Sequence, residues 1–268
     1  MTYVHGYSGR ETQRLLEQSL ILEELLHGGS SYPPGSRVLE VGCGVGAQTS
    51  ILARRNPGIK LTSIDISEES VAKATRLVSE LGLEQVDVLR ADLFDQPFEA
   101  ASFDHIFVCF VLEHLDDPIK ALGITKELLV KGGSLTVIEG DHGSGFWTPE
   151  SLPSRMAWKG LIDSQKNLGH DPNIGRRLYP LLKAAGFEPE YVSPRPVYAD
   201  QSNPVLLEGT VNKIITPMVF SAEQQVLEDK LVDPSLWKQG LEDLSRIASH
   251  QDGSFFYTWF KGLALQSL

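Results

Sequence analysis

The sequence predicts an α/β fold in which a mostly parallel sheet is covered by helices on both faces. Between residues 37 and 140, short apolar runs alternate with segments of helical period, which is typical of strands joined by crossover helices. The apolar runs are nearly uninterrupted by polar residues, as expected for strands that are buried on both faces. A glycine-rich turn in RVLEVGCGVGAQT directly follows the first run. These observations predict a ligand site at the carboxyl ends of the strands.

Local signals mark the elements of the first half. Ser8 to Glu11 fits a capping box before a leucine-rich helix that ends at Gly28-Gly29. Ser67 is predicted to cap the helix after the second strand, and Asp117-Pro118 to open a later helix that Gly132-Gly133 closes. The predicted strands are 38–41, 61–64, 85–89, 103–110 and 134–139, with a helix from the glycine turn to about residue 55.

The second half has a less regular pattern. Residues 178–185 are predicted to form a helix, and residues 191–198 a strand whose two prolines indicate an edge position. The other predicted helices are 205–220, 222–231 and 237–249, and the last strand is 254–265.

Composition excludes several classes of function. The net charge of −11 and the pI near 5.1 argue against a nucleic-acid partner, which needs a basic face. The two cysteines form neither a disulfide framework nor a zinc site. No apolar segment is long enough to span a bilayer, and the N-terminus does not resemble a signal peptide. We therefore expect a cytoplasmic protein without a membrane partner.

The glycine turn alone leaves several interpretations open. It can be a tight connection that binds no ligand, or it can hold a nucleotide against the N-terminus of the following helix. Gly42-x-Gly44-x-x-Ala47, with Asp65 downstream, loosely satisfies the dinucleotide fingerprint, so the spacing is compatible with NAD.

Three details point away from NAD. Glu40 lies inside an apolar strand and, as a buried carboxylate, needs a partner. It is better placed to meet a cationic amino-acid group than a pyrophosphate. The third glycine falls at Gly46, and Asp92 ends the third strand, where an adenine amine can find an acceptor.

Four segments extend this pattern: VLEVGCGVGAQT (38–49), LTSIDISEESVAKA (61–74), ADLFDQPFEAASFDHIFVCFVLEHLDDP (91–118) and KGGSLTVIEG (131–140). In this order they resemble the class I S-adenosylmethionine-dependent methyltransferases of the UbiE/COQ5-like (type 11) branch. The resemblance is close over residues 37–140 and weaker over 175–199 and 254–266. It implies a Rossmann-like sheet of seven strands in the order 3-2-1-4-5-7-6, with the last strand antiparallel.

The resemblance also implies a cofactor site for S-adenosylmethionine, whose product is S-adenosylhomocysteine. The glycine loop passes under the methionine part, Asp65 accepts from the ribose hydroxyls, and Asp92 accepts from the adenine amine. The implied cofactor-binding residues, with the N-terminal lid, are Tyr3, Tyr7, Glu40, Gly42, Cys43, Gly44, Gly46, Gln48, Asp65, Ile66, Ala91, Asp92, Leu93, Cys109, Phe110 and His114. Asp65 can instead cap a helix, Asp92 can be a turn residue, and His114 can serve packing alone. Cys43 is interpreted as a small apolar residue and not as a nucleophile.

Methyl transfer from a sulfonium is an in-line displacement, so the protein mainly positions the acceptor and excludes water. A base is needed only when the acceptor holds a proton. The segment after the predicted fifth strand is aimed at the acceptor, and we take His142 as the candidate base, with Asp141 orienting the substrate. These two residues can also be ordinary polar loop residues. The N-terminal YVHGY adds His5 as a third candidate.

We expect one domain, with a lid and helix at 1–30, a core at 31–198 and 254–268, and a helical cap at 199–253. The cap would enclose an apolar pocket for a small organic acceptor, or equally form a homodimer. Candidate pocket residues are Trp147, Trp158, Tyr198, Asn212 and Met218. The leading hypothesis is O- or N-methylation of a small molecule. The rivals are a catalytically silent S-adenosyl ligand binder and an NAD-dependent oxidoreductase, for which no Tyr-x-x-x-Lys pair follows the fourth strand.

Overall fold

A computed structural model describes residue 18 and residues 21–267 of the 268-residue chain. The capping box predicted at Ser8 to Glu11 lies outside the described residues. The described part of the N-terminal helix includes α2 (Glu23–His27), which ends before Gly28 as predicted.

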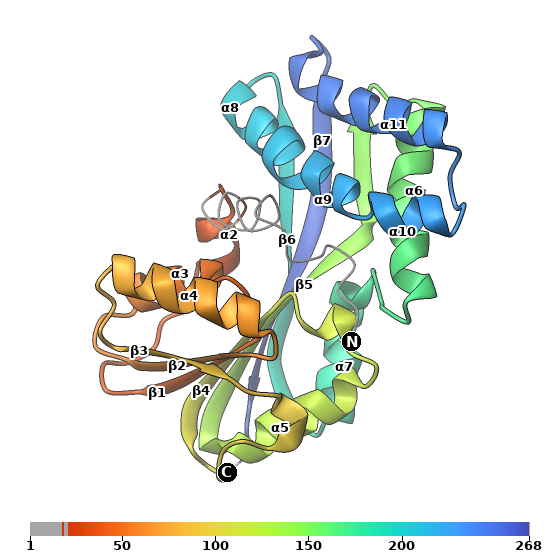
Figure 1. Ribbon diagram of the computed structural model, residues 1–268. Helices are drawn as coiled ribbons and strands as arrows, with labels where there is room; N and C mark the ends of the chain where they lie inside the picture. Colours follow the sequence, from red (N-terminus) through yellow and green to blue (C-terminus); the bar gives the residue numbers. More distant parts are fainter. Residues whose placement is uncertain (1–17, 19–20, 268) are drawn as a thin grey trace. The chain divides into compact units, whose positions relative to one another are not determined.

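The strands form one sheet in the order β3-β2-β1-β4-β5-β7-β6, which confirms the predicted topology (Figure 1). Neighbouring pairs from β3 through β5 are parallel. β7 runs antiparallel to β5, because Gln266, next to the end of β7, exchanges backbone hydrogen bonds with Gly132 and Gly133 near the start of β5. The strands are β1 (Arg37–Val41), β2 (Lys60–Asp65), β3 (Val86–Arg90), β4 (Phe103–Cys109), β5 (Leu129–Thr148), β6 (Glu188–Asp200) and β7 (Ser254–Leu265).

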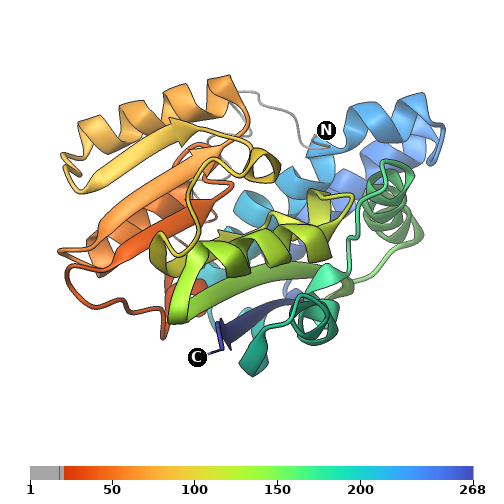
Figure 2. The same ribbon diagram turned by 90° about the horizontal axis from the view of Figure 1, so that it is seen from below.

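Helices cover both faces of the sheet formed by β1 to β5. α3 and α4 pack side by side on one face, while α5 and α7 pack together on the other (Figures 1 and 2). The helices along the chain are α3 (Ala47–Arg55), α4 (Glu68–Glu80), α5 (Pro118–Leu128), α6 (Leu152–Asn167), α7 (Leu178–Ala184), α8 (Pro204–Glu208), η4 (Gly209–Ile215), α9 (Thr216–Ser221), α10 (Glu223–Glu228) and α11 (Pro234–Arg246).

Two predicted helix caps are confirmed. The Ser67 hydroxyl accepts a hydrogen bond from the Ser70 N–H at 3.2 Å, and Asp117 accepts one from the Lys120 N–H at 2.9 Å. Each satisfies a first-turn amide that has no partner within the helix. These residues therefore set where α4 and α5 begin.

Two predicted boundaries around β5 are wrong. α5 ends at Leu128 instead of Gly132-Gly133, because the chain already pairs with β4 from Leu129 and the two glycines lie in an irregular part of β5. The strand was predicted to end at Glu139 but continues to Thr148. Its distal half is too polar and too rich in glycine to be predicted as a strand. The Thr258 N–H of β7 donates to the Ser144 hydroxyl in this half.

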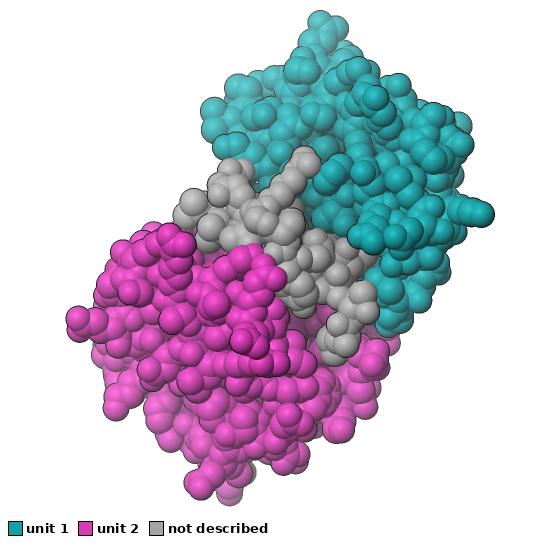
Figure 3. All heavy atoms as spheres, in the orientation of Figure 1, with its two compact units in different colours: residues 1–22, 141–173, 196–258 teal, residues 23–140, 174–195, 259–268 magenta. Residues whose placement is uncertain are grey.

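The chain divides into two compact units (Figure 3). One unit contains residues 23–140, 174–195 and 259–268, and we call it the sheet unit because it holds β1 to β4. Its core joins apolar side chains from β1, β4 and the proximal half of β5, such as Leu39, Ile106 and Leu135. The other contains, of the described residues, 18, 21, 22, 141–173 and 196–258, and we call it the cap unit. The predicted cap at 199–253 falls within it.

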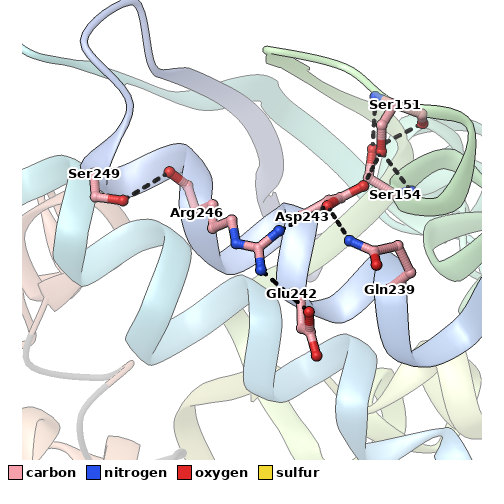
Figure 4. Close-up of polar contacts among 7 residues, drawn as sticks. All are labelled: Ser151, Ser154, Gln239, Glu242, Asp243, Arg246 and Ser249. Atoms are coloured by element: carbon pink, nitrogen blue, oxygen red, sulfur yellow. Dashed lines mark hydrogen bonds and ion pairs between the residues drawn. The ribbon is translucent and has the colours of Figure 1, made fainter.

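α6 and α11 form the centre of the cap unit. A Cβ atom added to Gly240 would lie 2.3 Å from the Pro153 carbonyl oxygen, so the glycine permits a close approach of the two helices. The Ser151 hydroxyl donates to Asp243 at 2.6 Å, and Gln239 donates to the other oxygen of the same carboxylate (Figure 4). Asp243 thereby links α11 to the start of α6.

Candidate functional site

The glycine loop lies between β1 and α3 in the sheet unit. The N–H groups of Gly42 and Cys43 both donate to the Ile64 carbonyl of β2, at 2.8 and 2.9 Å, so the loop folds back over the neighbouring strand. Gly46 occupies the N-cap of α3 without a side-chain cap. Amide groups at the start of α3 are therefore available to an anionic group.

Two glycines of this loop serve different purposes. A Cβ at Gly42 would lie 2.4 Å from the Val111 side chain, so this glycine permits close packing against the turn after β4. A Cβ at Gly44 would meet no atom of the described residues within 4 Å, although the residue has a positive φ of 53°. Gly44 therefore presents its backbone to open space, as the predicted ligand site requires.

Asp65 ends β2 directly beside this loop. One carboxylate oxygen accepts the Gly44 N–H at 2.8 Å, and the other accepts the Ser67 N–H at 2.9 Å. The sequence predicted ribose binding and did not predict the bond to Gly44. Each carboxylate oxygen has a further acceptor position, so these bonds are compatible with a ligand hydroxyl.

Glu40 is buried in β1 and has the partners that its position requires. The hydroxyls of Thr49 and Ser63 both donate to its Oε2, each at 2.6 Å. Burial raises the pKa of Glu40 to about 7 in spite of these two bonds. The expected need for a partner is confirmed, but the partners are hydroxyls that sequence reasoning missed.

The ends of β2 and β3 bring the predicted adenine-binding residues together. The Ala91 N–H donates to the Asp65 carbonyl at 3.1 Å, and Ile66 is 50% exposed. Asp92 accepts the Phe94 N–H at 2.9 Å and thereby caps the short helix η1 (Leu93–Asp95), where Leu93 is buried. Asp92 thus has the turn role that was its alternative interpretation. Its Oδ2 does not take part in that bond, so the predicted contact with an adenine amine stays a prediction.

The turn after β4 contains the remaining predicted residues. Phe110 has a positive φ of 59°, and its N–H donates to the Ile138 carbonyl of β5. His114 lies in η2 (Leu112–His114), where its ring nitrogen is 3.5 Å from the Glu113 carboxylate. Cys109 and Cys43 are free and buried, and burial raises the pKa of both thiols well above the usual range. Neither thiol is therefore suited to act as a nucleophile.

Gln48, in the first turn of α3, is held by a residue that the sequence did not single out. Its side-chain oxygen lies 2.6 Å from His27 Nε2 of α2, and the His27 ring stacks on Phe107 of β4. Burial lowers the pKa of His27 to about 4, so the imidazole is neutral at physiological pH. A histidine at the end of an amphipathic helix gives no sequence signal for this contact.

The predicted catalytic residues of the cap unit lie in the distal half of β5 and not in a loop. Successive strand residues point to opposite faces, so the side chains of Asp141 and His142 leave β5 in opposite directions, and their proposed roles stay separate predictions. His142 Nδ1 lies 2.7 Å from the Tyr257 hydroxyl of β7, and its carbonyl accepts the Trp158 indole N–H. His142 is only 4% exposed. Tyr3, His5 and Tyr7 lie outside the described residues.

The residues predicted to line an acceptor pocket have different environments. Trp147, Trp158 and Met218 are buried in the cap unit, and Trp147 packs against Trp158. Tyr198 is exposed, whereas the amide of Asn212 is bonded to Glu208 and Ser245.

No helix in the described part of the chain is both long and apolar enough to cross a lipid bilayer.

Comparison with known proteins adds a family match. Residues 39–137 match the family described as methyltransferase domain. A demethylmenaquinone methyltransferase of Bacillus cytotoxicus is 32% identical over 107 residues, which are 40% of this chain and 45% of that protein. The chain spans less than half of the length of this protein and of two further curated relatives, between 24% and 46%.

Two solved structures share the fold. Phosphoethanolamine N-methyltransferase 2 of Haemonchus contortus, in complex with S-adenosyl-L-methionine, has a TM-score of 0.59 and 16% identity, covering 95% of this chain and 57% of that one. The [4+2]-cyclase SpnF has a TM-score of 0.57 and 20% identity, covering 100% of this chain and 86% of that one.

Proposed function

We propose that the chain is an S-adenosylmethionine-dependent methyltransferase that acts on a small organic acceptor, because its residues 39–137 belong to the family of methyltransferase domains. The domain is of the class I, UbiE/COQ5-like type, whose cofactor is S-adenosylmethionine. We propose O- or N-methylation as the activity of the whole protein.

The open backbone at Gly44 is the observation that carries the cofactor assignment. A Cβ at Gly44 would lie more than 4 Å from every atom in the part of the chain that the structure describes, whereas a Cβ at Gly42 would clash with Val111. The Asp65 carboxylate is bonded to this same glycine, so a polyol that contacts Asp65 also lies at the glycine loop. The exposed Ile66 side chain offers an apolar surface next to Asp65, which suits an adenine ring.

When bound, S-adenosylmethionine supplies an activated methyl group. The residues of this chain then have three tasks: binding, orientation and exclusion of water. Asp65 and Asp92 supply oxygen acceptors at the ends of β2 and β3, and the glycine loop supplies backbone amides. Neither cysteine thiol acts as a nucleophile, because burial raises the pKa of both well above the usual range.

We propose His142, in the distal half of β5, as the base for an acceptor that holds a proton. The Tyr257 hydroxyl at 2.7 Å orients the imidazole, and the rings of Trp158 and Tyr257 lie against it. Aromatic side chains around a base suit a small organic acceptor. The two free cysteines support a cytoplasmic location, and the cap can also support a homodimer, which light scattering would detect.

The cofactor assignment is tested by calorimetry with S-adenosylmethionine. The wild-type protein is expected to bind, and Asp65→Ala to lose binding, because it removes both the ligand acceptor and the bond to the Gly44 N–H. Unchanged affinity in Asp65→Ala would reject the assignment.

Methyl transfer itself is tested with methyl-labelled cofactor and a metabolite extract, followed by identification of the labelled product by mass. A protein that binds the cofactor but labels nothing would be a silent S-adenosyl ligand binder instead. With the acceptor in hand, His142→Gln is expected to slow turnover of a protonated acceptor by roughly 10²- to 10⁴-fold with unchanged cofactor affinity. Loss of cofactor binding in this variant would assign His142 a structural role.

A further inference from the structure

Glu139 is a buried carboxyl group that the proposed function does not use. It follows Ile138 in β5, whose partner in β4 is the last strand residue, Cys109. Its side chain is 0% exposed. Oε1 accepts two backbone hydrogen bonds, from the Val111 N–H at 3.0 Å and from the Leu112 N–H at 2.7 Å. Oε2 is buried, and no described residue forms a hydrogen bond with it.

The two hydrogen bonds to Oε1 stabilise the turn at residues 110–112, whose backbone conformation is unusual for its residue types. Phe110 adopts a left-handed conformation, with φ of 59°, that residues with a side chain rarely adopt. Its N–H is bonded to the Ile138 carbonyl, directly before Glu139. The end of β5 therefore fixes residues 110–112 by three hydrogen bonds, two of which come from a single side-chain oxygen.

The same turn packs against the glycine loop. A Cβ at Gly42 would lie 2.4 Å from one methyl carbon of Val111 and 3.4 Å from the other. The backbone of Gly42 is thus in contact with the Val111 side chain. The Gly42 N–H is in turn bonded to the Ile64 carbonyl of β2. A contiguous path of contacts therefore runs from Glu139 through Val111 to the loop, entirely within the sheet unit.

We propose that Glu139 is a positioning residue of the methyl-donor site: through its bonds to the Val111 and Leu112 amides it holds Val111 against Gly42 and thereby fixes the glycine loop for S-adenosylmethionine. The inference rests on the proposed function, because that function makes the loop a cofactor site. Glu139 acts through backbone amides and not by touching the cofactor.

The two backbone amides require from Glu139 only an acceptor oxygen at the position of Oε1. Burial raises the pKa of Glu139 well above its usual range, and the nearby Glu113 carboxylate of η2 raises it further. A neutral side chain of the same length with an oxygen at this position, such as glutamine, is therefore expected to perform the role of Glu139.

The test compares cofactor affinity in three variants by calorimetry. Glu139→Gln keeps the length and the acceptor oxygen and is expected to bind S-adenosylmethionine within about threefold of wild type. Glu139→Asp keeps the carboxyl group but is one methylene shorter, so it cannot reach both amides, and its affinity is expected to fall at least tenfold. Glu139→Ala is expected to fall as far. Thr125→Ala is the matched control, because it removes a buried bond to a backbone carbonyl within α5 and leaves the loop untouched.

Coupling to Val111 supplies a readout that general destabilisation does not mimic. Val111→Ala is expected to weaken cofactor binding in the wild-type background and to have little additional effect in the Glu139→Asp background, because Glu139 acts through Val111. Additive losses would overturn the inference, as would full affinity in Glu139→Asp or a loss in Glu139→Gln equal to that in Glu139→Asp. If Glu139→Ala does not fold, the comparison of Glu139→Gln with Glu139→Asp still tests the inference. Failure of the wild-type protein to bind the cofactor would reject the proposed function instead.

Discussion

Alanine in place of Gly44 is expected to weaken S-adenosylmethionine binding while lowering stability only slightly. The substitution adds one methyl group at the point where the glycine loop faces open space, because a Cβ there lies more than 4 Å from any atom of residue 18 or residues 21–267. No packing within the protein is disturbed. The new methyl group instead occupies space that the cofactor is proposed to fill.

The substitution is expected to change two free energies, that of unfolding and that of cofactor binding. A left-handed conformation at φ of 53° costs a residue with a side chain about 1–2 kcal/mol relative to glycine. Part of this is offset, because alanine also restricts the unfolded chain by about 0.4–1 kcal/mol. Overpacking against a bound ligand costs about 1–3 kcal/mol, which corresponds to roughly a 5- to 150-fold weaker affinity.

Gly82→Ala is the matched control. Gly82 follows α4 with φ of 63°, and a Cβ there would also meet no described residue within 4 Å. Both variants are therefore expected to lose a similar free energy of unfolding in urea titrations. Calorimetry with S-adenosylmethionine is expected to separate them, with wild-type affinity for Gly82→Ala only. Equal affinities in the two variants would show that Gly44 does not face the cofactor, and the reasoning from the open glycine would be wrong.

Two further predictions concern stability. Gly240→Ala is expected to destabilise the cap unit by about 1–3 kcal/mol in thermal unfolding, because the added Cβ would lie 2.3 Å from the Pro153 carbonyl oxygen. Gly123→Ala, a helical glycine of α5 with no atom within 4 Å of the added Cβ, is expected to stabilise slightly, and equal effects would contradict the packing argument. Burial raises the pKa of Glu40 from 4.5 to about 7, so the folded state retains a proton that the unfolded state releases. The free energy of unfolding therefore falls as pH rises from about 4.5 to 7, by about 3 kcal/mol from this group. Glu40→Gln is expected to remove this dependence, which denaturant titrations across that range would measure; an unchanged pH dependence would contradict it.

Local signals predicted the elements around the site well. Ser67 and Asp117 mark the helix starts because a side-chain oxygen followed by the first helical turn is a local arrangement, and the structure confirms both caps. Asp65 and Asp92 were predicted at strand ends, and the structure brings these ends together through the bond between Ala91 and Asp65.

The predictions around β5 were wrong for a physical reason. The polar, glycine-containing stretch around His142 has no strand periodicity of its own. Residues with weak intrinsic preference adopt the conformation that their neighbours in the sheet impose. His142 therefore belongs to a strand and meets Tyr257, which lies 115 positions later in the sequence.

By itself, the sequence determined the α/β class, the position of the glycine loop and the acids at the ends of β2 and β3, because periodicity, capping and turn residues act over a few neighbouring positions. Only the tertiary structure decided which hydroxyls satisfy Glu40, that His27 holds Gln48, and that Glu139 supports the turn against Gly42. Each of these depends on a buried polar group. Such a group must find its hydrogen-bond partner inside the protein, and the fold brings that partner from a distant part of the chain.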